Sequence, residues 1–425
     1  MMNIQDLLSY AASPAGEKRL EALYGNRAGE AERQQKRYAA LIRRHAELFG
    51  DGPAPLIVSA PGRTELCGNH TDHNNGLVMA AAVNLDTVAA VRPRSDTRVN
   101  LHSEGFAPVA LDLADLAPVP AEAGKPASII RGVANRLHEL GKKIGGFDAN
   151  VTSNVLTGSG LSSSAAFEVL IVAILDALYN GMTVDAITRA QISQYAENVY
   201  FGKPSGLMDQ MASSVGGLVA IDFEAEPKVT PLQMDLSGYS LVVVNTGGSH
   251  DDLTADYAAV RLEMNAVAHC FGCEVLRQVE PERLWRELPR VREQAGARAV
   301  LRAYHYYSEN ERVRRLIEAV KAGDTVGFKE ILIASGRSSF MYLQNVYPNP
   351  ASQQMSVALC LAERLLQGRG AWRVHGGGFA GTTLNVVPLD MEADFVRAMD
   401  AAFGEGASHV LSIRREGAAI VFQGA

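Results

Sequence analysis

Hydrophobic and polar positions along this chain follow helical spacing in some blocks and strand-like spacing in others. Over roughly the first fifty residues the apolar positions recur at helical spacing, and Leu41, Ile42 and Leu48 fall on one face. Segments rich in β-branched residues come next and predict strands at 56–60, 77–83, 87–92 and 99–102. The chain is therefore expected to open with helices and to continue with strands.

The remaining pattern mixes the two kinds of element. It predicts helices at 129–140, 165–178 and 184–200, a strand at 149–154, and loops at 158–164 and 202–206. Further on it predicts a buried strand at 240–246, helices over 253–334 with breaks near Pro281 and Pro289, strands with a glycine-rich turn over 371–387, and two late strands within 410–422. Elements that come in blocks favour an α+β fold over a strict βαβ alternation.

Length and composition predict two domains. A chain of 425 residues with 47% hydrophobic residues is longer than most single domains and can bury a substantial core. No low-complexity linker marks a boundary, so we place it just before the apolar strand SLVVVNT, near residue 237. The expected domains are 1–237 and 238–425.

Charge and segment composition exclude several kinds of partner. The formal net charge of −7 argues against nucleic acid, because phosphate backbones are bound by clustered Lys and Arg. No stretch approaches the ~18 apolar residues of a membrane-spanning helix, and the charged residues Asp6, Glu17 and Lys18 argue against a signal peptide. We expect a soluble cytoplasmic protein with no membrane partner.

Four cysteines are consistent with a reducing compartment. Cys270 and Cys273 form a single CxxC, and no second pair of cysteines or nearby pair of histidines completes a zinc site. We therefore expect two reduced thiols within a helix.

The segment 60–76, APGRTELCGNHTDHNNG, has the composition of a polar ligand site. It places Arg63, His70 and Asp72 between glycines and a proline, directly after an apolar run. A surface loop would be richer in Lys, Glu and Ser. We expect these three side chains to lie in a turn that leaves a strand.

The segment 156–166, LTGSGLSSSAA, is a candidate phosphate-binding loop. Its glycines allow the backbone to approach a ligand, and free N–H groups at the start of the following helix attract phosphate. It is not a Walker A loop, since no G-K-[ST] follows, and it lacks the third glycine of a dinucleotide fingerprint. A glycine-serine turn that only caps a helix is the alternative.

The segment 196–210, AENVYFGKPSGLMDQ, carries two carboxylates on either side of a Gly-Pro loop, Glu197 and Asp209. Asp209 follows Leu207 and Met208, and a carboxylate in such an apolar frame must be paired, bound to metal or functional. The alternative is an aspartate that caps the next helix. The later segment 374–381, VHGGGFAG, indicates close backbone contact, although a tight β-turn explains it equally well.

In this order, the four segments resemble the galactokinase branch of the GHMP small-molecule kinases. The resemblance extends from about residue 45 to the C-terminus. It implies a two-domain α+β fold, with an N-terminal ribosomal-protein-S5-like domain, a C-terminal ferredoxin-like α/β sandwich and the active site between them. It also implies transfer of phosphate from ATP to the anomeric hydroxyl of a sugar, with D-galactose as the expected substrate.

The resemblance assigns roles to individual residues. Asp209 would act on the anomeric hydroxyl as base or positioner, and Arg63 would keep it ionised and balance the charge of the transferring phosphoryl group. Ser164 and Glu197 would hold Mg²⁺. The residues expected around ATP are Gly158, Ser159, Gly160, Leu161, Ser162, Ser163, Ser164 and Ala165. The residues expected around the sugar are Asn69, His70, Asp72, Gly206 and Tyr257, with the glycines 376–378 supporting the nucleotide loop.

The chain departs from the family pattern G-R-V-N-L-I-G-E-H-T-D-Y in its first motif. Thr64 and Glu65 replace V-N, and Asn69 replaces the glutamate, which resembles an acceptor for the 6-hydroxyl of the sugar. Asparagine still accepts a hydrogen bond but carries no charge. Galactose would then be held more loosely at C6, or the substrate would differ there, as galacturonate does.

Two further departures from the family pattern concern the nucleotide and the N-terminal segment. The stretch 126–133, PASIIRGV, lacks a tryptophan that would stack on adenine, so the preference for ATP over GTP is open. A helical extension of about thirty residues precedes the usual start, and it could pack on the surface or at an oligomer contact. We expect a monomer or a weak homodimer.

Two alternatives to an active galactokinase-type enzyme are a non-catalytic sugar sensor and another GHMP kinase. Known sensors resemble kinases that have lost the S-A pair of the phosphate loop, whereas Ser164 and Ala165 are intact here. Kinases for homoserine or mevalonate lack the G-x-H-T-D and M-D-Q segments. Both alternatives are therefore less favoured than the sugar kinase.

Overall fold

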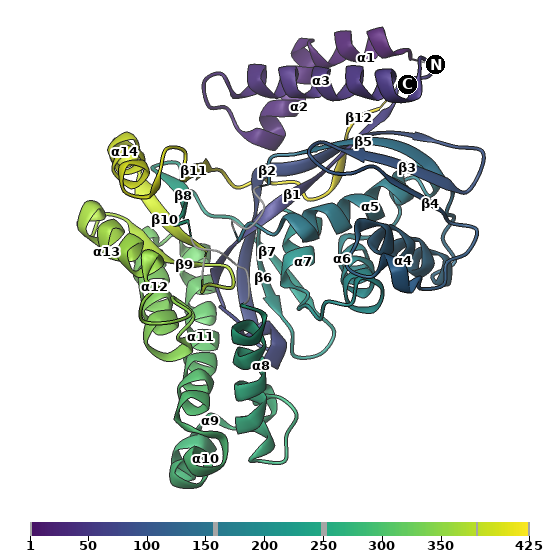
Figure 1. The fold of residues 1–425 in the computed structure, drawn as a ribbon. Helices are drawn as coiled ribbons and strands as arrows, with labels where there is room; N and C mark the ends of the chain where they lie inside the picture. The colour runs from purple at the N-terminus through teal and green to yellow at the C-terminus, as the bar shows by residue number, and fades with distance from the viewer. Residues whose placement is uncertain (1, 156–159, 248–252, 380, 424–425) are drawn as a thin grey trace.

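Two β-sheets form the framework of the chain (Figure 1). The computed structural model describes residues 2–155, 160–247, 253–379 and 381–423. Within them, no helix is both long and apolar enough to cross a membrane.

The first sheet has strand order β12-β1-β2-β5-β3-β4, with β6 paired to β2 and β7 to β6. All pairs are antiparallel except β3 with β5. Its strands are β1 (Leu56–Cys67), β2 (Leu77–Pro93), β3 (Arg98–Ser103), β4 (Val109–Asp112), β5 (Phe147–Ser153), β6 (Leu218–Asp222), β7 (Lys228–Leu232) and β12 (Ala419–Phe422).

Helices cover both faces of this sheet. Val58 and Ala89 pack towards a core that includes α4 (Pro126–Glu139), α5 (Ser163–Tyr179) and α6 (Ala186–Tyr195), and α7 (Met208–Val215) follows nearby. Ile57 and Val88, one position along each strand, pack on the opposite side against α1 (Ile4–Ala11), α2 (Pro14–Tyr24) and α3 (Glu30–Phe49). Because both faces are buried, these strands read as continuous apolar runs.

The second sheet has strand order β11-β8-β10-β9. Its strands are β8 (Tyr239–Asn245), β9 (Ala371–His375), β10 (Thr382–Pro388) and β11 (Ser408–Leu411). Val243 faces α11 (Ala297–Ala322) and α12 (Thr325–Ser338), while Val242 faces α13 (Gln354–Leu366) and α14 (Glu392–Phe403). The core around α11 also contains Leu66 of β1 and Met79 of β2, so one apolar core joins the two sheets.

The helices α8 (Thr254–His269), α9 (Pro281–Arg286) and α10 (Leu288–Ala295) pack against α11. The expected break at Pro281 is the start of α9, as proline is tolerated in a first helical turn. Cys270 and Cys273 are free thiols, but they follow α8 and do not lie within a helix as expected. Cys270 is the C-terminal cap of α8, and the backbone turns after it.

Several predicted elements are longer or divided in the structure. The predicted strands 77–83 and 87–92 are one strand, β2, and the predicted helix 184–200 is α6 followed by a π-helical turn (Ala196–Phe201). The proposed division near residue 237 lies between β7 and β8. The chain end returns to the first sheet as β12, so a division by sequence alone separates β12 from its partner β1.

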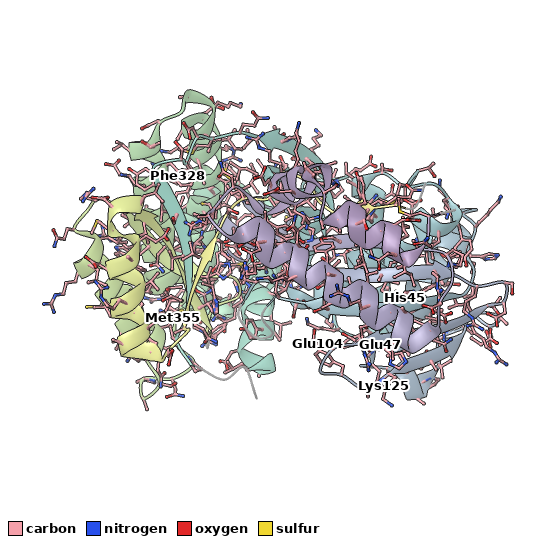
Figure 2. All side chains as sticks on the ribbon, turned by 90° about the horizontal axis from the view of Figure 1, so that it is seen from above. His45, Glu47, Glu104, Lys125, Phe328 and Met355 are labelled. Atoms are coloured by element: carbon pink, nitrogen blue, oxygen red, sulfur yellow. The ribbon has the colours of Figure 1, made fainter. Side chains whose placement is uncertain are left out.

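The N-terminal extension lies across the first sheet (Figure 1), and Figure 2 shows α3, with His45 and Glu47, on the upper side of the molecule. A buried ion network fixes it there. The carboxylate of Asp86 accepts from Arg37 Nη1 at 2.7 Å, from Arg414 Nη1 at 2.9 Å and from the Tyr24 hydroxyl at 2.6 Å. Burial would raise the pKa of Asp86, but the two arginines outweigh it and hold the pKa below its usual value.

Replacing Asp86→Asn should destabilise the protein by about 3–5 kcal/mol, because it leaves the fully buried Arg414 without its counter-charge. The depressed pKa means that Asp86 contributes stability above its unfolded pKa, and this contribution is lost as the pH falls through the lower folded value. The deficit in the free energy of unfolding, measured with urea, should therefore shrink towards acid pH. Asp390→Asn, in an exposed surface pair with Arg369, is the control and should leave the urea midpoint unchanged. Equal stability of Asp86→Asn and wild type at pH 7 would contradict this assignment.

Candidate active site

Arg63 and Asp209 form a bidentate ion pair where the two sheets approach each other. Arg63 Nε donates to Asp209 Oδ1 at 2.7 Å, and Nη2 donates to Oδ2 at 2.8 Å. Arg63 lies within β1 and not in the turn expected from the sequence, because β1 continues to Cys67. Its side chain is therefore fixed by a paired strand, and Asp209 projects towards it from the first turn of α7.

The environment of Asp209 keeps it ionised. Burial would raise its pKa, but Arg63 and the hydroxyl of Ser162, which donates to Oδ2 at 2.5 Å, lower the pKa below its usual value. The Asp209 side chain is 30% exposed, whereas that of Arg63 is 6% exposed. The carboxylate thus stays accessible while the guanidinium behind it is buried.

The predicted phosphate loop meets this pair. Arg63 Nη1 donates to the carbonyl of Gly160, and the amide of Arg63 donates to Leu161 O at 3.0 Å. α5 begins at Ser163, and among the described residues no side chain caps it, so the N–H groups of its first turn are candidates for binding an anion. Ser164 is exposed in that turn and Ala165 is buried, while Gly158 and Ser159 lie outside the described residues.

The glycine-rich turn after β9 packs against the same loop. A Cβ on Gly376 would lie 3.2 Å from the carbonyl oxygen of Gly160, so the turn and the loop are in close contact. A Cβ on Gly377 would lie 2.5 Å from Tyr257 Cε1, so only glycine fits between the turn and that ring. The turn therefore brings the second sheet onto the phosphate loop.

His70 and Tyr257 bind this turn from the other side. His70 Nε2 donates to Gly377 O at 2.9 Å, and the Tyr257 hydroxyl donates to Gly378 O at 2.9 Å, with the two rings 6.4 Å apart. Burial lowers the pKa of His70 to about 4, so the ring is neutral at physiological pH. Both side chains are held by backbone carbonyls.

Asp72 and Gly206 are in contact. Asp72 begins a short 3-10 turn (Asp72–Asn74), and a Cβ at position 206 would overlap its Oδ2. This contact brings the loop before α7, and with it Asp209, next to the loop that carries His70 and Asp72. The structure thus gathers the sugar residues expected from the sequence around one region, with Asn69 as the exception.

Asn69 does not face that region. It is 0% exposed, and its side-chain amide is hydrogen-bonded to Glu65, Gly376, Ser339 and Asn345. The contact with a sugar 6-hydroxyl expected from its position in the motif has no support in this geometry.

A buried acidic group that sequence analysis missed lies beneath the phosphate loop. Gln210 Nε2 donates to Glu168 Oε2 and to Glu197 Oε2, both at 2.9 Å. Burial, followed by repulsion from Glu197, raises the pKa of Glu168 above its usual value. Glu168 was hidden from sequence analysis because it lies in a strongly apolar helix, and its spacing from Ser164 (i, i+4) is the one available signal.

Side-chain oxygens of the kind that binds Mg²⁺ come together at the start of α5. Ser164 lies one turn before Glu168 on the same face of α5, and Gln210 links Glu168 to Glu197. Gln210 Oε1 is buried and has no donor among the described residues, and Lys203 Nζ balances Glu197 Oε1 at 3.1 Å. In the described part of the chain, no three His, Cys, Asp or Glu gather as a metal cage. Such sparse oxygen ligands suit Mg²⁺ held largely by substrate phosphates.

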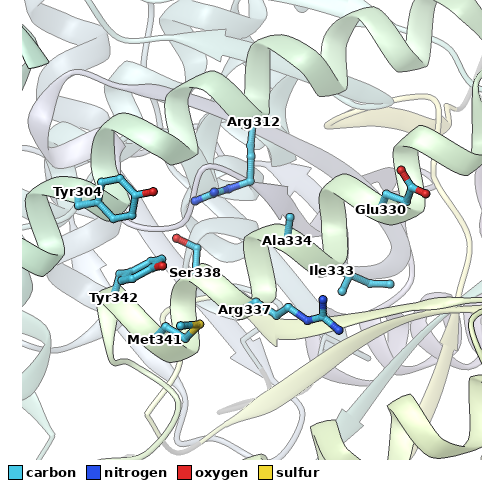
Figure 3. A pocket seen from close by; sticks show the side chains of 9 residues that line it. All are labelled: Tyr304, Arg312, Glu330, Ile333, Ala334, Arg337, Ser338, Met341 and Tyr342. Atoms are coloured by element: carbon cyan, nitrogen blue, oxygen red, sulfur yellow. The ribbon is translucent and has the colours of Figure 1, made fainter.

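A hollow of about 460 Å³ is lined by side chains of α11, of α12 and of the turn that follows α12 (Figure 3). Two of its lining residues also support the loop that carries His70. Ser338 Oγ contacts His305 Nδ1 at 2.9 Å, and Arg312 Nε donates to Glu309 Oε2 at 2.6 Å. Glu309 Oε1 in turn accepts from Gly68 N at 3.0 Å, so this hollow backs onto the candidate site.

Comparison with known proteins identifies the class first. Residues 128–217 match the GHMP kinases N terminal domain, and the fold is similar to that of a mevalonate kinase of known structure (TM-score 0.61, 14% identity, covering 84% of this chain and 99% of that one). The fold and phosphate loop therefore define a GHMP kinase.

More specific matches give the family. Residues 43–93 match the galactokinase galactose-binding signature. Galactokinases of Streptomyces coelicolor (85% of this chain, 91% of the relative) and Homo sapiens (88% and 94%) are each 32% identical to it. The structure of Lactococcus lactis galactokinase complexed with galactose is similar over 90% of this chain and 99% of that one, with TM-score 0.79 and 25% identity. This chain belongs to the galactokinase family.

Replacing Gln210→Met should lower stability by about 1.5–3 kcal/mol at pH 9, because two buried carboxylates lose their shared donor. Because its pKa is raised, Glu168 ionises in the folded protein only as the pH rises through that raised pKa, and only then does it need a donor for its charge. The loss of stability in Gln210→Met should therefore be smaller at pH 6. Thermal unfolding at both pH values measures this difference. Gln194→Met, which loses one bond to Ser205 O, is the control and should show no such pH dependence. A deficit that does not change with pH would count against the shared-donor arrangement.

Proposed function

We propose that this protein transfers the γ-phosphoryl group of ATP to the anomeric hydroxyl of D-galactose, giving galactose 1-phosphate and ADP. The observation that carries the proposal is the Arg63–Asp209 pair held directly against the phosphate loop through Gly160 and Ser162. The pair sets an accessible carboxylate and a buried cation beside a helix N-terminus, a kind of position that attracts phosphate, and this supports the proposal. Membership of the galactokinase family supports galactose as the acceptor.

In this proposal Asp209 receives the hydrogen bond of the anomeric hydroxyl and orients its oxygen towards the γ-phosphate. Its lowered pKa makes it a weak base, so its main work is positioning, and it takes the proton late, as the new O–P bond forms. Arg63 keeps Asp209 ionised and contributes positive charge next to the transferring group. Phosphoryl transfer depends mainly on such positioning and charge balance.

The phosphates of ATP would lie on the loop 158–165 and the first turn of α5. Ser164 and Glu197 would hold Mg²⁺, which when bound neutralises charge on the phosphate oxygens. Glu197 would have to exchange its contact with Lys203 for the cation, and this exposed lysine would then be free to move towards the phosphates. The sugar would be held by His70, Asp72, Gly206 and Tyr257.

The alternatives receive less support from the geometry. A non-catalytic sensor would not need the intact Ser164, Ala165, Arg63 and Asp209. A galacturonate kinase was suggested by Asn69, but Asn69 is buried and bonded within the protein. A monomer or weak dimer and a cytoplasmic location remain predictions.

The test is ADP release with ATP and Mg²⁺ against galactose, galacturonate, N-acetylgalactosamine, 6-deoxygalactose, arabinose and glucose. Galactose should have the highest kcat/KM, and Asp209→Asn should lower kcat by about 10²–10⁴-fold, because the hydroxyl loses its charged acceptor. Asp96→Asn, an isosteric change at a surface ion pair, is the control and should keep full activity. Turnover of galactose by Asp209→Asn at the wild-type rate would refute the role of Asp209, and no turnover of any sugar by wild type would refute the function.

A further inference from the structure

A buried polar network lies directly beneath the sugar loop, defined here as residues 68–76. We propose that Glu65 and Asn69 act as one positioning pair, which locks the sugar loop onto the glycine-rich turn of the other sheet, and that neither residue contacts the sugar. The proposal deepens the proposed function, on which it rests for the identity of the substrate. It assigns the motif positions 65 and 69 to positioning and not to sugar recognition.

The hydrogen-bonding capacity of Asn69 is used up inside the protein. Its Nδ2 donates to Glu65 Oε1 and Oε2, both at 3.1 Å, and to Gly376 O at 2.7 Å. Its Oδ1 accepts from Asn345 Nδ2 at 2.7 Å and from Ser339 Oγ at 3.3 Å. A primary amide has two hydrogens and two lone pairs, so nothing is left for a ligand.

The charge of Glu65 is balanced by the second sheet. Arg373 of β9 donates to Glu65 Oε1 at 2.9 Å, and both side chains are almost completely buried. Burial raises the pKa of Glu65, and Arg373, Arg63 of β1 and the Asn69 amide oppose that rise. Glu309 and His305 of α11 are the other titratable groups next to this network.

The pair holds the backbone that carries the sugar residues. His305 Nε2 donates to Asn69 O at 2.9 Å, and Glu309 Oε1 accepts from Gly68 N at 3.0 Å, so α11 clamps the loop at two adjacent residues. Asn69 Nδ2 then ties the loop to Gly376, while the next residue, His70, binds Gly377. A shift of the Asn69 side chain would therefore move His70 and the glycine-rich turn together.

The identities of the residues at positions 65 and 69 indicate that the two positions depend on each other. Relative to the pattern G-R-V-N-L-I-G-E, asparagine and glutamate have exchanged places at positions 65 and 69, and the structure places the two residues in contact. The pair therefore still combines one carboxylate with one amide. Two substitutions that reverse this polarity should compensate each other.

Asn69→Asp tests the pair, because it is isosteric and sets a second carboxylate against Glu65 and the Gly376 carbonyl. We expect the melting temperature to fall and the KM for galactose to rise by about tenfold at pH 8, with the KM for ATP changing less than twofold. Adding Glu65→Gln supplies a new donor, so the double variant E65Q/N69D should recover part of both losses. Glu65→Gln alone should also lower the melting temperature, because it leaves the buried Arg373 without its carboxylate partner.

A pH series gives a second readout. Lowering the pH from 8 to 6 allows the two carboxylates of N69D to share a proton, so its galactose KM relative to wild type should improve. E65Q/N69D should show no such improvement. Asn385→Asp is the matched control, since Asn385 is also buried and its Nδ2 also donates to a carbonyl, Val242 O at 3.1 Å, but no carboxylate of the described residues is bonded to it. Glu65→Gln should not rescue N385D.

Two outcomes would overturn the proposal. One is a double variant no better than N69D in both melting temperature and galactose KM. The other is an N69D variant with unchanged melting temperature, raised galactose KM and no recovery at low pH, which would indicate direct sugar contact by Asn69. Because rescue of the melting temperature needs no substrate, a failure of the proposed function would appear separately, as absence of galactose turnover by wild type.

Discussion

The bidentate ion pair between Arg63 and Asp209 is the interaction on which the site depends. It joins a strand of the first sheet to the first turn of α7, and through Gly160 and Ser162 it also fixes the end of the phosphate loop. A carboxylate so close to the start of α5 would repel an anionic ligand there without a neighbouring cation. The buried guanidinium removes this conflict and leaves the carboxylate ionised and accessible.

The same solution recurs at three other buried carboxylates of this fold. Asp86 is matched by two arginines beneath the N-terminal extension, Glu65 by Arg373 between the sheets, and Glu309 by Arg312 behind the sugar loop. The Asp86 and Glu65 pairs join elements that are distant in sequence, while the Glu309–Arg312 pair lies within α11 and reaches the sugar loop through Gly68. Buried ion pairs add little net stability compared with apolar packing, but breaking one is costly, so they fix the relative positions of the elements they join.

Much of the fold could be predicted from the sequence, because the apolar periodicity identified most helices and strands. The family resemblance also implied that Arg63 lies beside Asp209, and the two side chains are in contact in the structure, whereas the hydrogen bond from Ser162 to Asp209 was not predicted. The partners Arg373 and Asn345 could not be predicted, since each reaches the site from a distant element through tertiary packing. Gln210 is next to Asp209 in the sequence, but its contacts with Glu168 and Glu197 depend on how α5, α7 and the turn after α6 pack together. Asn69 shows the limit of motif analysis: its position in the motif suggested a ligand contact, and only its side-chain orientation reveals that it points into the protein.

The most direct test of this account is a crystal structure with galactose, Mg²⁺ and a non-hydrolysable ATP analogue bound. The account predicts the anomeric oxygen within hydrogen-bonding distance of Asp209, the γ-phosphate at the start of α5, and the Asn69 amide still bonded to Glu65 and Gly376. A sugar whose anomeric oxygen lies away from Asp209, or which is contacted by the side chain of Asn69, would contradict it.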